Sequence, residues 1–264
     1  MLLSFFYIKE NKGKAMLTEY TSDYLLDKKI KIFQPINGYR ASTDAVLLAA
    51  FVSGFKGGKI LDVGSGTCAV SLCLAQRLKQ FSPQITGLEL QPELAELSNF
   101  SAQQNGFENI FYQNADIRLG TKENNVAPCS FDVVISNPPY SEHDLPSPNK
   151  SKATAHNHSD FDLRHWLEFC LKAVKPFGKI YIINRAEALP EICSIFSGKA
   201  GNLQILSIYS KQKQNAKRIL ICAQKDSKAP CRLLPPFFTH SDDGSYSEAA
   251  QKILRSGLGF DDIV

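Results

Sequence analysis

Residues 59–67, KILDVGSGT, decide the fold of this chain. They begin as a short apolar strand, turn at two glycines, and lead into an apolar helical stretch that continues to Leu78. Strand, glycine-rich turn and helix in this order form a ligand-binding unit of open α/β sheets, because glycines let the backbone approach a ligand and the helix N-terminus faces it. The stretch therefore predicts a parallel sheet flanked by helices, with a ligand site after this strand.

Two further predicted strands each end beside an acidic residue. Residues 84–90 are strand-like and contain Glu89, about two dozen residues after the glycines, where a carboxylate can accept from both hydroxyls of a ribose. Residues 109–113 form the next strand, and Asp116 follows it. Alone, Asp116 is more typical of a loop or a helix cap. Because it comes after Asp62, the acid near the end of the strand at residues 59–63, and after Glu89, a binding role is favoured.

A fourth apolar run, residues 131–136, ends in the turn Asn137-Pro138-Pro139-Tyr140. The side-chain carbonyl of Asn137 and the main-chain carbonyl of Pro138 are acceptors, while the prolines remove competing N–H donors and stiffen the turn. Tyr140 adds a flat aromatic face. Two acceptors beside a ring suit a planar group with an NH2, either the exocyclic amine of a base or a side-chain amide. A turn that merely terminates a strand is the simpler alternative.

The segment before residues 59–67 predicts a small hairpin and a helix. Residues 17–36 hold two apolar, β-branched stretches around a polar break, which favours a β-hairpin that covers one end of the sheet. The following loop contains Arg40 and leads to Thr43 and Asp44, which open an alanine- and leucine-rich helix. Thr43 and Asp44 are most simply its caps. The functional alternative places Arg40 and Asp44 beside the ligand.

Beyond the proline turn the chain completes an α/β pattern. Residues 141–159 are polar and aperiodic, which is typical of a lid or a substrate-binding loop. Asp160 is expected to cap a helix whose apolar spacing buries Trp166. Two closing strands, residues 202–209 and 218–223, are joined by a basic connection. Its cations are either solvated or in contact with phosphate, and the sequence leaves both open: Lys211, Lys213, Lys217 and Arg218.

The composition is that of an ordinary globular protein. The chain has 264 residues and a net charge of +4, so it is long enough for one large domain and mildly basic, which permits a polyanionic partner without requiring one. Seven cysteines without a Cys-x-x-Cys pair favour reduced thiols in a cytosolic protein and argue against a zinc site. No stretch approaches the ~18 apolar residues that cross a bilayer.

Taken in order, these motifs resemble the class I S-adenosylmethionine-dependent methyltransferases. The resemblance rests on the strand-end acids, the glycine turn and two proline-containing turns: Asp62, Gly64, Gly66, Glu89, Asp116, Asn137, Pro138, Pro139, Tyr140 and residues 175–178. It implies an α/β, Rossmann-like, mostly parallel seven-stranded sheet with an antiparallel last strand, helices on both faces and a small N-terminal hairpin. The chain departs from the family's third glycine, where it has Cys68.

The resemblance also implies a cofactor, S-adenosylmethionine, and residues that hold it. Asp62 is expected to face the cationic amino group, Glu89 the ribose and Asp116 the adenine amine. The other expected cofactor contacts are Gly64, Gly66, Arg40, Asp44 and Asn137. No metal is implied.

We expect a single methyltransferase domain over residues 1–264. Its parts are an N-terminal extension with Met16 as an alternative start, a hairpin and helix, the cofactor-binding catalytic core and a C-terminal tail: residues 1–15, 17–56, 57–225 and 226–264.

Two flanking stretches narrow the resemblance to the bacterial valine-tRNA adenine-N6 methyltransferase family, which modifies adenine 37 of the anticodon loop. They are residues 38–48, GYRASTDAVLL, and Pro235-Pro236 with residues 243–247, DGSYS. This implies a tRNA partner, a cytoplasmic location, no membrane association, and an adenine stacked on Tyr140 whose amine is bound by the two carbonyl acceptors. No general base is required, because a methylated amine loses its proton readily.

Three alternatives share parts of this pattern. A protein glutamine methyltransferase that acts on release factors has the same proline turn, but carries a helical domain where this chain has only residues 1–58 before the cofactor strand. A guanine-N2 rRNA methyltransferase usually lacks the loop at residues 38–48. A non-enzymatic RNA-binding protein on a decayed methyltransferase fold is suggested only by Cys68.

Overall fold

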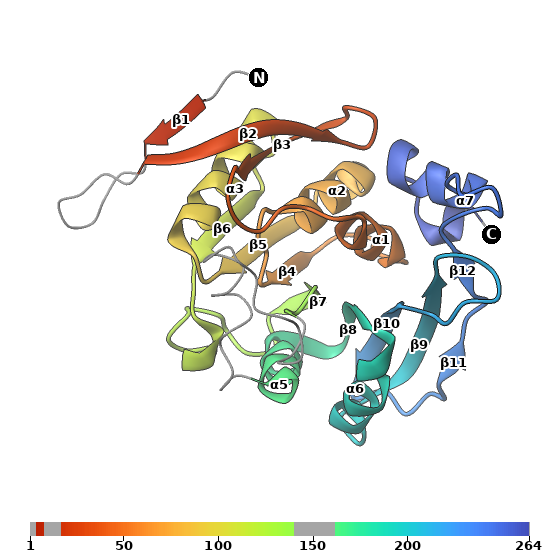
Figure 1. Ribbon diagram of the computed structural model, residues 1–264. Helices are drawn as coiled ribbons and strands as arrows, with labels where there is room; N and C mark the ends of the chain where they lie inside the picture. Colours follow the sequence, from red (N-terminus) through yellow and green to blue (C-terminus); the bar gives the residue numbers. More distant parts are fainter. Residues whose placement is uncertain (1–3, 8–16, 140–161, 264) are drawn as a thin grey trace.

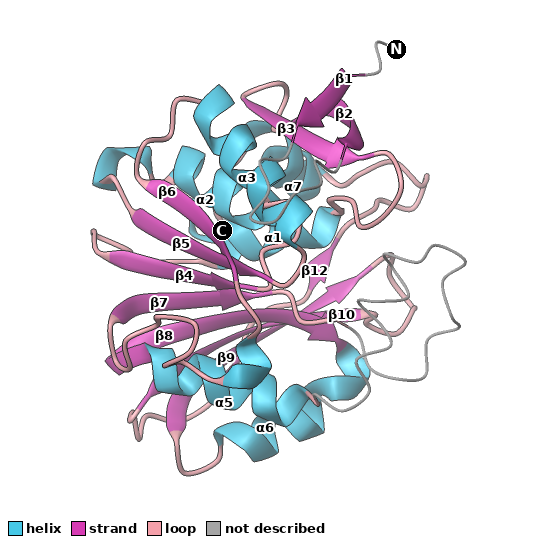
Figure 2. Cartoon of the chain, turned by 90° about the vertical axis from the view of Figure 1, so that its left-hand side faces the viewer, coloured by secondary structure: helices cyan, strands magenta, loops and turns pink. Residues whose placement is uncertain are grey.

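The computed structural model describes residues 4–7, 17–139 and 162–263 (Figure 1). The predictions for Tyr140, for the loop at residues 141–159 and for Asp160 lie outside these residues. The described chain forms a small N-terminal sheet and one large sheet between two layers of helices (Figure 2).

The large sheet has the predicted α/β architecture. Its strands lie in the order β11-β9-β10-β8-β7-β4-β5-β6, with β12 beside β9. Neighbours from β6 to β8 are parallel, whereas β10 is antiparallel to both β8 and β9. The strands are β4 Lys59–Val63, β5 Gln84–Glu89, β6 Ile110–Asn114, β7 Phe131–Ser136, β8 Val174–Arg185, β9 Ala200–Tyr209, β10 Arg218–Lys225, β11 Arg232–Leu233 and β12 Phe237–Phe238.

The sheet differs from the expected seven strands at one edge. The chain returns after β10 and adds β11 and β12, both parallel to β9. Pro235 and Pro236 lie between these two short strands. Proline has no N–H to donate, so it separates the pairing along β9 into two pieces.

Helices cover both faces of the sheet. In Figure 2, α1, α2 and α3 lie on one face, and α5 and α6 on the other. The helices are α1 Thr43–Phe51, α2 Ala69–Arg77, α3 Pro92–Gln104, α5 Leu163–Ala173, α6 Leu189–Phe196 and α7 Glu248–Gln251. Short single turns are η1 Lys79–Phe81, η2 Ile117–Leu119, η3 Ala186–Ala188, η4 Lys252–Ser256 and η5 Phe260–Asp262.

The apolar strands fill two cores, one on each face. Ile60 belongs to the core beneath α1 and α2, whereas its neighbour Leu61 belongs to the core beneath α5 and α6. Ile135 and Val134 of β7 divide in the same way. A strand that buries both of its faces reads as a continuous apolar run, which is why these strands were recognisable from the sequence.

The N-terminal hairpin forms as predicted but packs elsewhere. Strands β2 Leu17–Leu25 and β3 Ile30–Pro35 are antiparallel, and β1 Ser4–Tyr7 pairs with β2. The prediction that the hairpin covers one end of the large sheet is wrong, because β3 lies along α3 (Figure 1). Ser101 Oγ accepts from Phe33 N at 3.1 Å, and the Asn105 side chain binds the main chain of Lys31 through both of its polar atoms.

One predicted helix cap is also corrected. Ser42 occupies the N-cap position of α1, so Thr43 and Asp44 lie inside its first turn instead of capping it. Among the described residues, helix α5 follows Asp162, whose carboxylate accepts from His165 N at 2.9 Å. Several acids and hydroxyls precede each helix, and only the backbone path decides which of them caps it.

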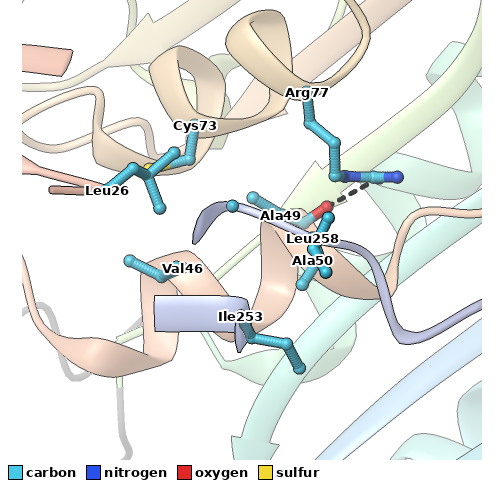
Figure 3. A pocket seen from close by; sticks show the side chains of 9 residues that line it. Leu26, Val46, Ala49, Ala50, Cys73, Arg77, Ile253 and Leu258 are labelled. Atoms are coloured by element: carbon cyan, nitrogen blue, oxygen red, sulfur yellow. Dashed lines mark hydrogen bonds between the residues drawn. The ribbon is translucent and has the colours of Figure 1, made fainter. Parts of the chain in front are cut away.

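The C-terminal segment closes the molecule over α1 and α2. Ile253 of η4 and Leu258 line a small cavity with Val46, and Arg77 reaches past it (Figure 3). Arg77 Nη2 donates to Ala49 O at 2.9 Å and also to the carbonyl of Val52. The half-buried Arg77 thereby satisfies carbonyls at the end of α1 that have no partner within the helix.

Two kinds of feature are absent from the described residues. None of their helices is long and apolar enough to span a membrane. They hold no group of three or more histidine, cysteine, aspartate or glutamate side chains arranged to bind a metal ion.

Candidate active site

Four polar residues from the sequence analysis meet at one edge of the sheet. Asp62, Glu89, Asp116 and Asn137 lie at or just after the carboxyl ends of β4, β5, β6 and β7, which are neighbours in the sheet. The parallel registers bring these strand ends level with one another. The edge outside the carboxyl ends of parallel strands is where open α/β folds bind ligands.

The glycine turn after β4 needs both of its glycines. Gly64 and Gly66 adopt φ angles of +71° and +54°. A Cβ on Gly64 would lie 2.6 Å from Trp166 Cζ2, and one on Gly66 would lie 2.8 Å from Tyr39 Cε1. Any side chain here would be strained and would collide with an aromatic ring.

Glu89 is held against the glycine turn. Gly66 N donates to its Oε2 at 2.8 Å and Gln91 N to its Oε1 at 2.9 Å. The side chain is buried, and burial raises its pKa. An ionised carboxylate has about four acceptor positions, so two remain for hydroxyl groups of a ligand.

Asp62 is a second buried carboxylate beside the first. It is 1% exposed, and Ser71 Oγ donates to its Oδ2. Burial raises the pKa of Asp62 to about 7, and the charge of Glu89 adds to the shift. Two like charges in a buried site are costly, so a cation bound between them would be strongly favoured.

Asp116 already has a cationic neighbour. Its carboxylate accepts from Arg118 Nε at 2.7 Å and from Arg118 Nη2 at 2.5 Å. It also caps η2 by accepting from Arg118 N. Asp116 is therefore a cap, which is the simpler of the two roles considered from the sequence. It also lies just after the end of β6, which is the position on which the binding role was predicted.

Asn137 is linked to an aromatic residue from the N-terminal loop. Its Nδ2 lies 3.5 Å from Tyr39 Oη and donates to it. Burial raises the pKa of Tyr39 to about 12, with further contributions from Asp44 and Asp62. Tyr39 thus stays neutral and spans the space between the glycine turn and Asn137. Pro138 is buried and Pro139 is exposed.

Arg40 and Asp44 bind to other elements. Arg40 Nη2 pairs with Asp23 at 2.6 Å, and its Nη1 donates to Pro35 O at 2.9 Å. Asp44 Oδ2 accepts from Arg218 Nε of β10 at 2.9 Å. The contacts of Arg40 anchor the residue next to Tyr39, and the contact of Asp44 anchors the first turn of α1.

The glycine turn also presents unused polar atoms. Ser65 Oγ and Thr67 Oγ1 are buried and have no hydrogen-bond partner among the described residues. A buried hydroxyl without a partner is costly, whereas a bound ligand with polar groups can satisfy it. The buried acids, the cradle at the glycines and these hydroxyls together fit a polar cofactor that carries positive charge.

Comparison with known proteins identifies the family. Residues 55–225 match a family model described as a methyltransferase domain. A tRNA1(Val) (adenine(37)-N6)-methyltransferase of Mannheimia succiniciproducens is 31% identical over 210 residues, which are 75% of this chain and 74% of that protein. The chain belongs to this methyltransferase family.

Two further comparisons agree with this methyltransferase assignment. A protein of the same name from Haemophilus influenzae is 27% identical, over 86% of this chain and 95% of its own length. The crystal structure of a predicted O-methyltransferase, protein Atu636 from Agrobacterium tumefaciens, superimposes with a TM-score of 0.69 at 23% identity, covering 82% of this chain and 98% of that one. The second similarity supports the fold.

The methyltransferase has Cys68 where the class I pattern has a third glycine. Cys68 adopts φ +61°, the left-handed conformation that glycine adopts at little cost. The turn nevertheless closes, because Cys68 N donates to Ser65 O at 2.8 Å and Cys68 O accepts from Leu72 N at 3.0 Å. The thiol is fully buried, and burial raises its pKa to about 12. Cys68 therefore completes the turn at some strain.

Sequence reasoning missed two parts of the methyltransferase site. Tyr39 belongs to the stretch at residues 38–48 that narrowed the family resemblance, but in this loop only Arg40 and Asp44 were expected to lie at the site. Trp166 packs against the second core as predicted, and in addition its Nε1 donates to Ser136 Oγ at 2.8 Å while Ser136 Oγ donates to Val63 O at 2.7 Å. These two bonds hold the Trp166 ring in the position in which it packs against Gly64. The only sequence signal was a small polar residue, Ser136, inside an apolar strand.

Proposed function

We propose that this methyltransferase transfers a methyl group to N6 of an adenine in the anticodon loop of a tRNA, with adenine 37 of tRNA1(Val) as the first candidate. The observation that carries the proposal is the position of Asn137. It follows β7 directly beside the glycine turn of β4, so an amine held by Asn137 would lie next to a cofactor held by that turn. We propose that the protein acts in the cytoplasm, where tRNA is found.

S-adenosylmethionine is the cofactor, and when bound it supplies a methyl group on a positively charged sulfur. We propose that Asp62 faces its cationic amino group and that Glu89 accepts from its ribose hydroxyls. Asp116 would accept from its adenine amine and share its carboxylate with Arg118. The main chain at Gly64 and Gly66 would border the cofactor, because no Cβ intervenes there.

The turn after β7 orients the target amine. Because Nδ2 of Asn137 donates to Tyr39, its Oδ1 is left to accept from the amine, and the carbonyl of Pro138 supplies a second acceptor. Two such bonds would direct the nitrogen lone pair towards the methyl group. Tyr140, placed from the sequence alone, would stack on the base, and Pro139 would stiffen the turn. An unpaired loop adenine leaves its stack at a cost of a few kcal/mol.

Arg40 and Asp44 are proposed to act on the cofactor site through the position of Tyr39. The bonds of Arg40 to Asp23 and Pro35 O anchor the residue next to Tyr39, and the bond of Asp44 to Arg218 fixes the start of α1 that follows. Residues 57–225 are proposed as the catalytic core of a single domain.

Methyl transfer to RNA tests the proposal. Purified protein is incubated with labelled S-adenosylmethionine and total RNA from cells that lack this enzyme, and the RNA is digested to nucleosides. Label in N6-methyladenosine from the tRNA fraction supports the proposal. Label in guanosine, or only in protein when a cell extract is supplied, would assign the enzyme to the rRNA or glutamine class instead. Asn137→Ala is the matched inactive control.

A further inference from the structure

Residues 239–247, which we call the C-terminal turn, carry a motif to which the proposed reaction gives no role. The turn is attached to the end of β9, because Thr239 N donates to Tyr209 O at 2.9 Å and His240 N to Ser210 O at 3.0 Å. It directly follows β12 and lies more than a hundred residues after the glycine turn of β4 in the sequence (Figure 1).

The sheet topology places the C-terminal turn at the same edge as Asn137. The strand β8 is parallel to β7, so Arg185 at its end lies at the carboxyl edge. Arg218 pairs with Arg185 and also with Ile208, which brings the end of β9 to that edge too. The strands β7 and β9 are three positions apart in the sheet. At ~4.8 Å per strand, the separation is about 14 Å, a length spanned by about four stacked nucleotides.

The C-terminal turn presents a rigid aromatic pair. The rings of His240 and Tyr246 are stacked, with centroids 4.8 Å apart and planes at 24°. Main-chain bonds join Ser241 to Ser245 at 2.9 Å and Ser247 to Thr239 at 3.0 Å, so the stack does not depend on side chains alone. Tyr246 is 38% exposed although it is one of the large apolar side chains. An exposed aromatic face held in position is suited to stacking with an unpaired base.

The neighbouring charges suit a phosphate backbone. Lys211 Nζ donates to Asp242 O at 3.1 Å, which places the basic connection between β9 and β10 against the turn. Lys213 and Lys217 of that connection are exposed. Two acids also lie in the turn. The carboxylate of Asp243 is engaged by Ser245 N and Oγ, at 2.9 and 2.7 Å, whereas Asp242 is exposed and offsets one lysine.

We propose that the C-terminal turn and the basic connection form a second contact with the RNA substrate, in which an unpaired nucleotide near the target adenine stacks on Tyr246. Lys213 and Lys217 contact the phosphates between that nucleotide and the target. This inference rests on the proposed function, because it assumes a single-stranded RNA loop as substrate. It adds a specificity contact outside the residues that bind the cofactor and the reacting amine.

Tyr246→Ala tests the stacking contact. Binding of unmodified tRNA is expected to weaken about 5- to 150-fold, the effect of losing one base–aromatic stack, while the affinity for S-adenosylmethionine and the turnover at saturating tRNA stay unchanged. Tyr246→Phe should retain most of the binding. Phe177→Ala is the matched control, since Phe177 is exposed but lies towards the opposite edge of the sheet.

The lysines are tested by salt dependence. The double variant Lys213→Ala/Lys217→Ala should reduce the slope of log K against log salt by about 0.7 for each phosphate that the variant no longer neutralises. Lys228→Ala, at an exposed lysine beyond the other end of β10, should leave the slope unchanged.

Three outcomes separate this inference from the proposed function. Unaltered tRNA affinity in Tyr246→Ala, with the wild type methylating tRNA, would overturn the inference alone. Parallel loss of tRNA binding and cofactor binding would overturn it too, because it would indicate a structural role. A wild type that methylates no tRNA would contradict the proposed function itself.

Discussion

Tyr39 is the residue whose role depends most on the three-dimensional arrangement. Its hydroxyl accepts from Asn137 Nδ2, and its ring lies against Gly66. Tyr39→Phe keeps the ring and removes the acceptor, so the Asn137 amide loses the bond that fixes its orientation. We expect turnover to fall about 5- to 10-fold, the worth of one hydrogen bond, with little change in cofactor affinity. Equal losses in both quantities would indicate that Tyr39 only shapes the cofactor site.

Asp62 gives the site a pH dependence. Because burial raises its pKa to about 7, Asp62 is mostly protonated at pH 6 in the free protein, whereas a bound cation favours the ionised form. Affinity for S-adenosylmethionine should therefore rise as the pH increases from 6 to 8, and binding near pH 7 should release a proton. The raised pKa also means that the unfolded chain releases this proton at a lower pH than the folded protein does. The contribution of Asp62 to the stability of the free protein therefore falls as the pH rises towards 7.

Calorimetry in two buffers with different ionisation enthalpies measures that proton release. Asp62→Asn should bind the cofactor more weakly and lose the part of the pH dependence that belongs to this carboxyl group. A wild-type dissociation constant that stays the same from pH 6 to 8, without proton release, would rule out this account of Asp62.

At the residue scale, sequence patterns located the groups that sit at strand ends. Asp62, Glu89 and Asn137 were found because each follows an apolar run at a defined spacing. Tyr39 was not found, because its approach to Gly66 depends on how a loop crosses the sheet edge. The expected contacts of Arg40 and Asp44 with the cofactor stay predictions, since in the structure their side chains bind Asp23 and Arg218.

At the element scale, Arg77 connects α2 to the end of α1. Arg77→Met removes two hydrogen bonds to the carbonyls of Ala49 and Val52 and keeps most of the side-chain volume. Unsatisfied carbonyls and a missing charge-assisted bond predict a loss of about 2–4 kcal/mol in the free energy of unfolding. Thermal unfolding should show a melting temperature about 5–10 °C lower. Lys79→Met, at an exposed position nearby, is the control, and equal melting temperatures for the two variants would refute this role.

Elements that depend on tertiary pairing escaped the sequence analysis. The strands β11 and β12 have two residues each and form only because β9 offers an open edge. The hairpin was predicted, but its place was not, because the side chains of Ser101 on α3 and of Asn105 at the C-terminal end of α3 bind β3 through its main chain. Hydrogen bonds to the main chain leave no pattern in the sequence of the strand that receives them.

At the scale of the whole molecule, the order of the motifs along the chain was sufficient to predict the sheet apart from the added edge strands β11 and β12. Successive βα units place their strand ends at one edge, so acids and a proline turn far apart in sequence form one site. The same topology brings the C-terminal turn to this edge through the antiparallel strand β10. One edge thus gathers the residues proposed to bind the cofactor, the turn proposed to bind the amine and the second RNA contact that we infer.

The central claim is that Asn137 orients the amine that is methylated. Single-turnover methyl transfer by Asn137→Ala, at saturating tRNA and S-adenosylmethionine, tests it most directly. The account predicts a rate about 100- to 1000-fold below that of the wild type, comparable to the loss of one transition-state hydrogen bond, with cofactor affinity within about twofold of the wild type. Normal turnover at saturation, with cofactor affinity lost instead, would contradict it and make Asn137 a cofactor-binding residue only.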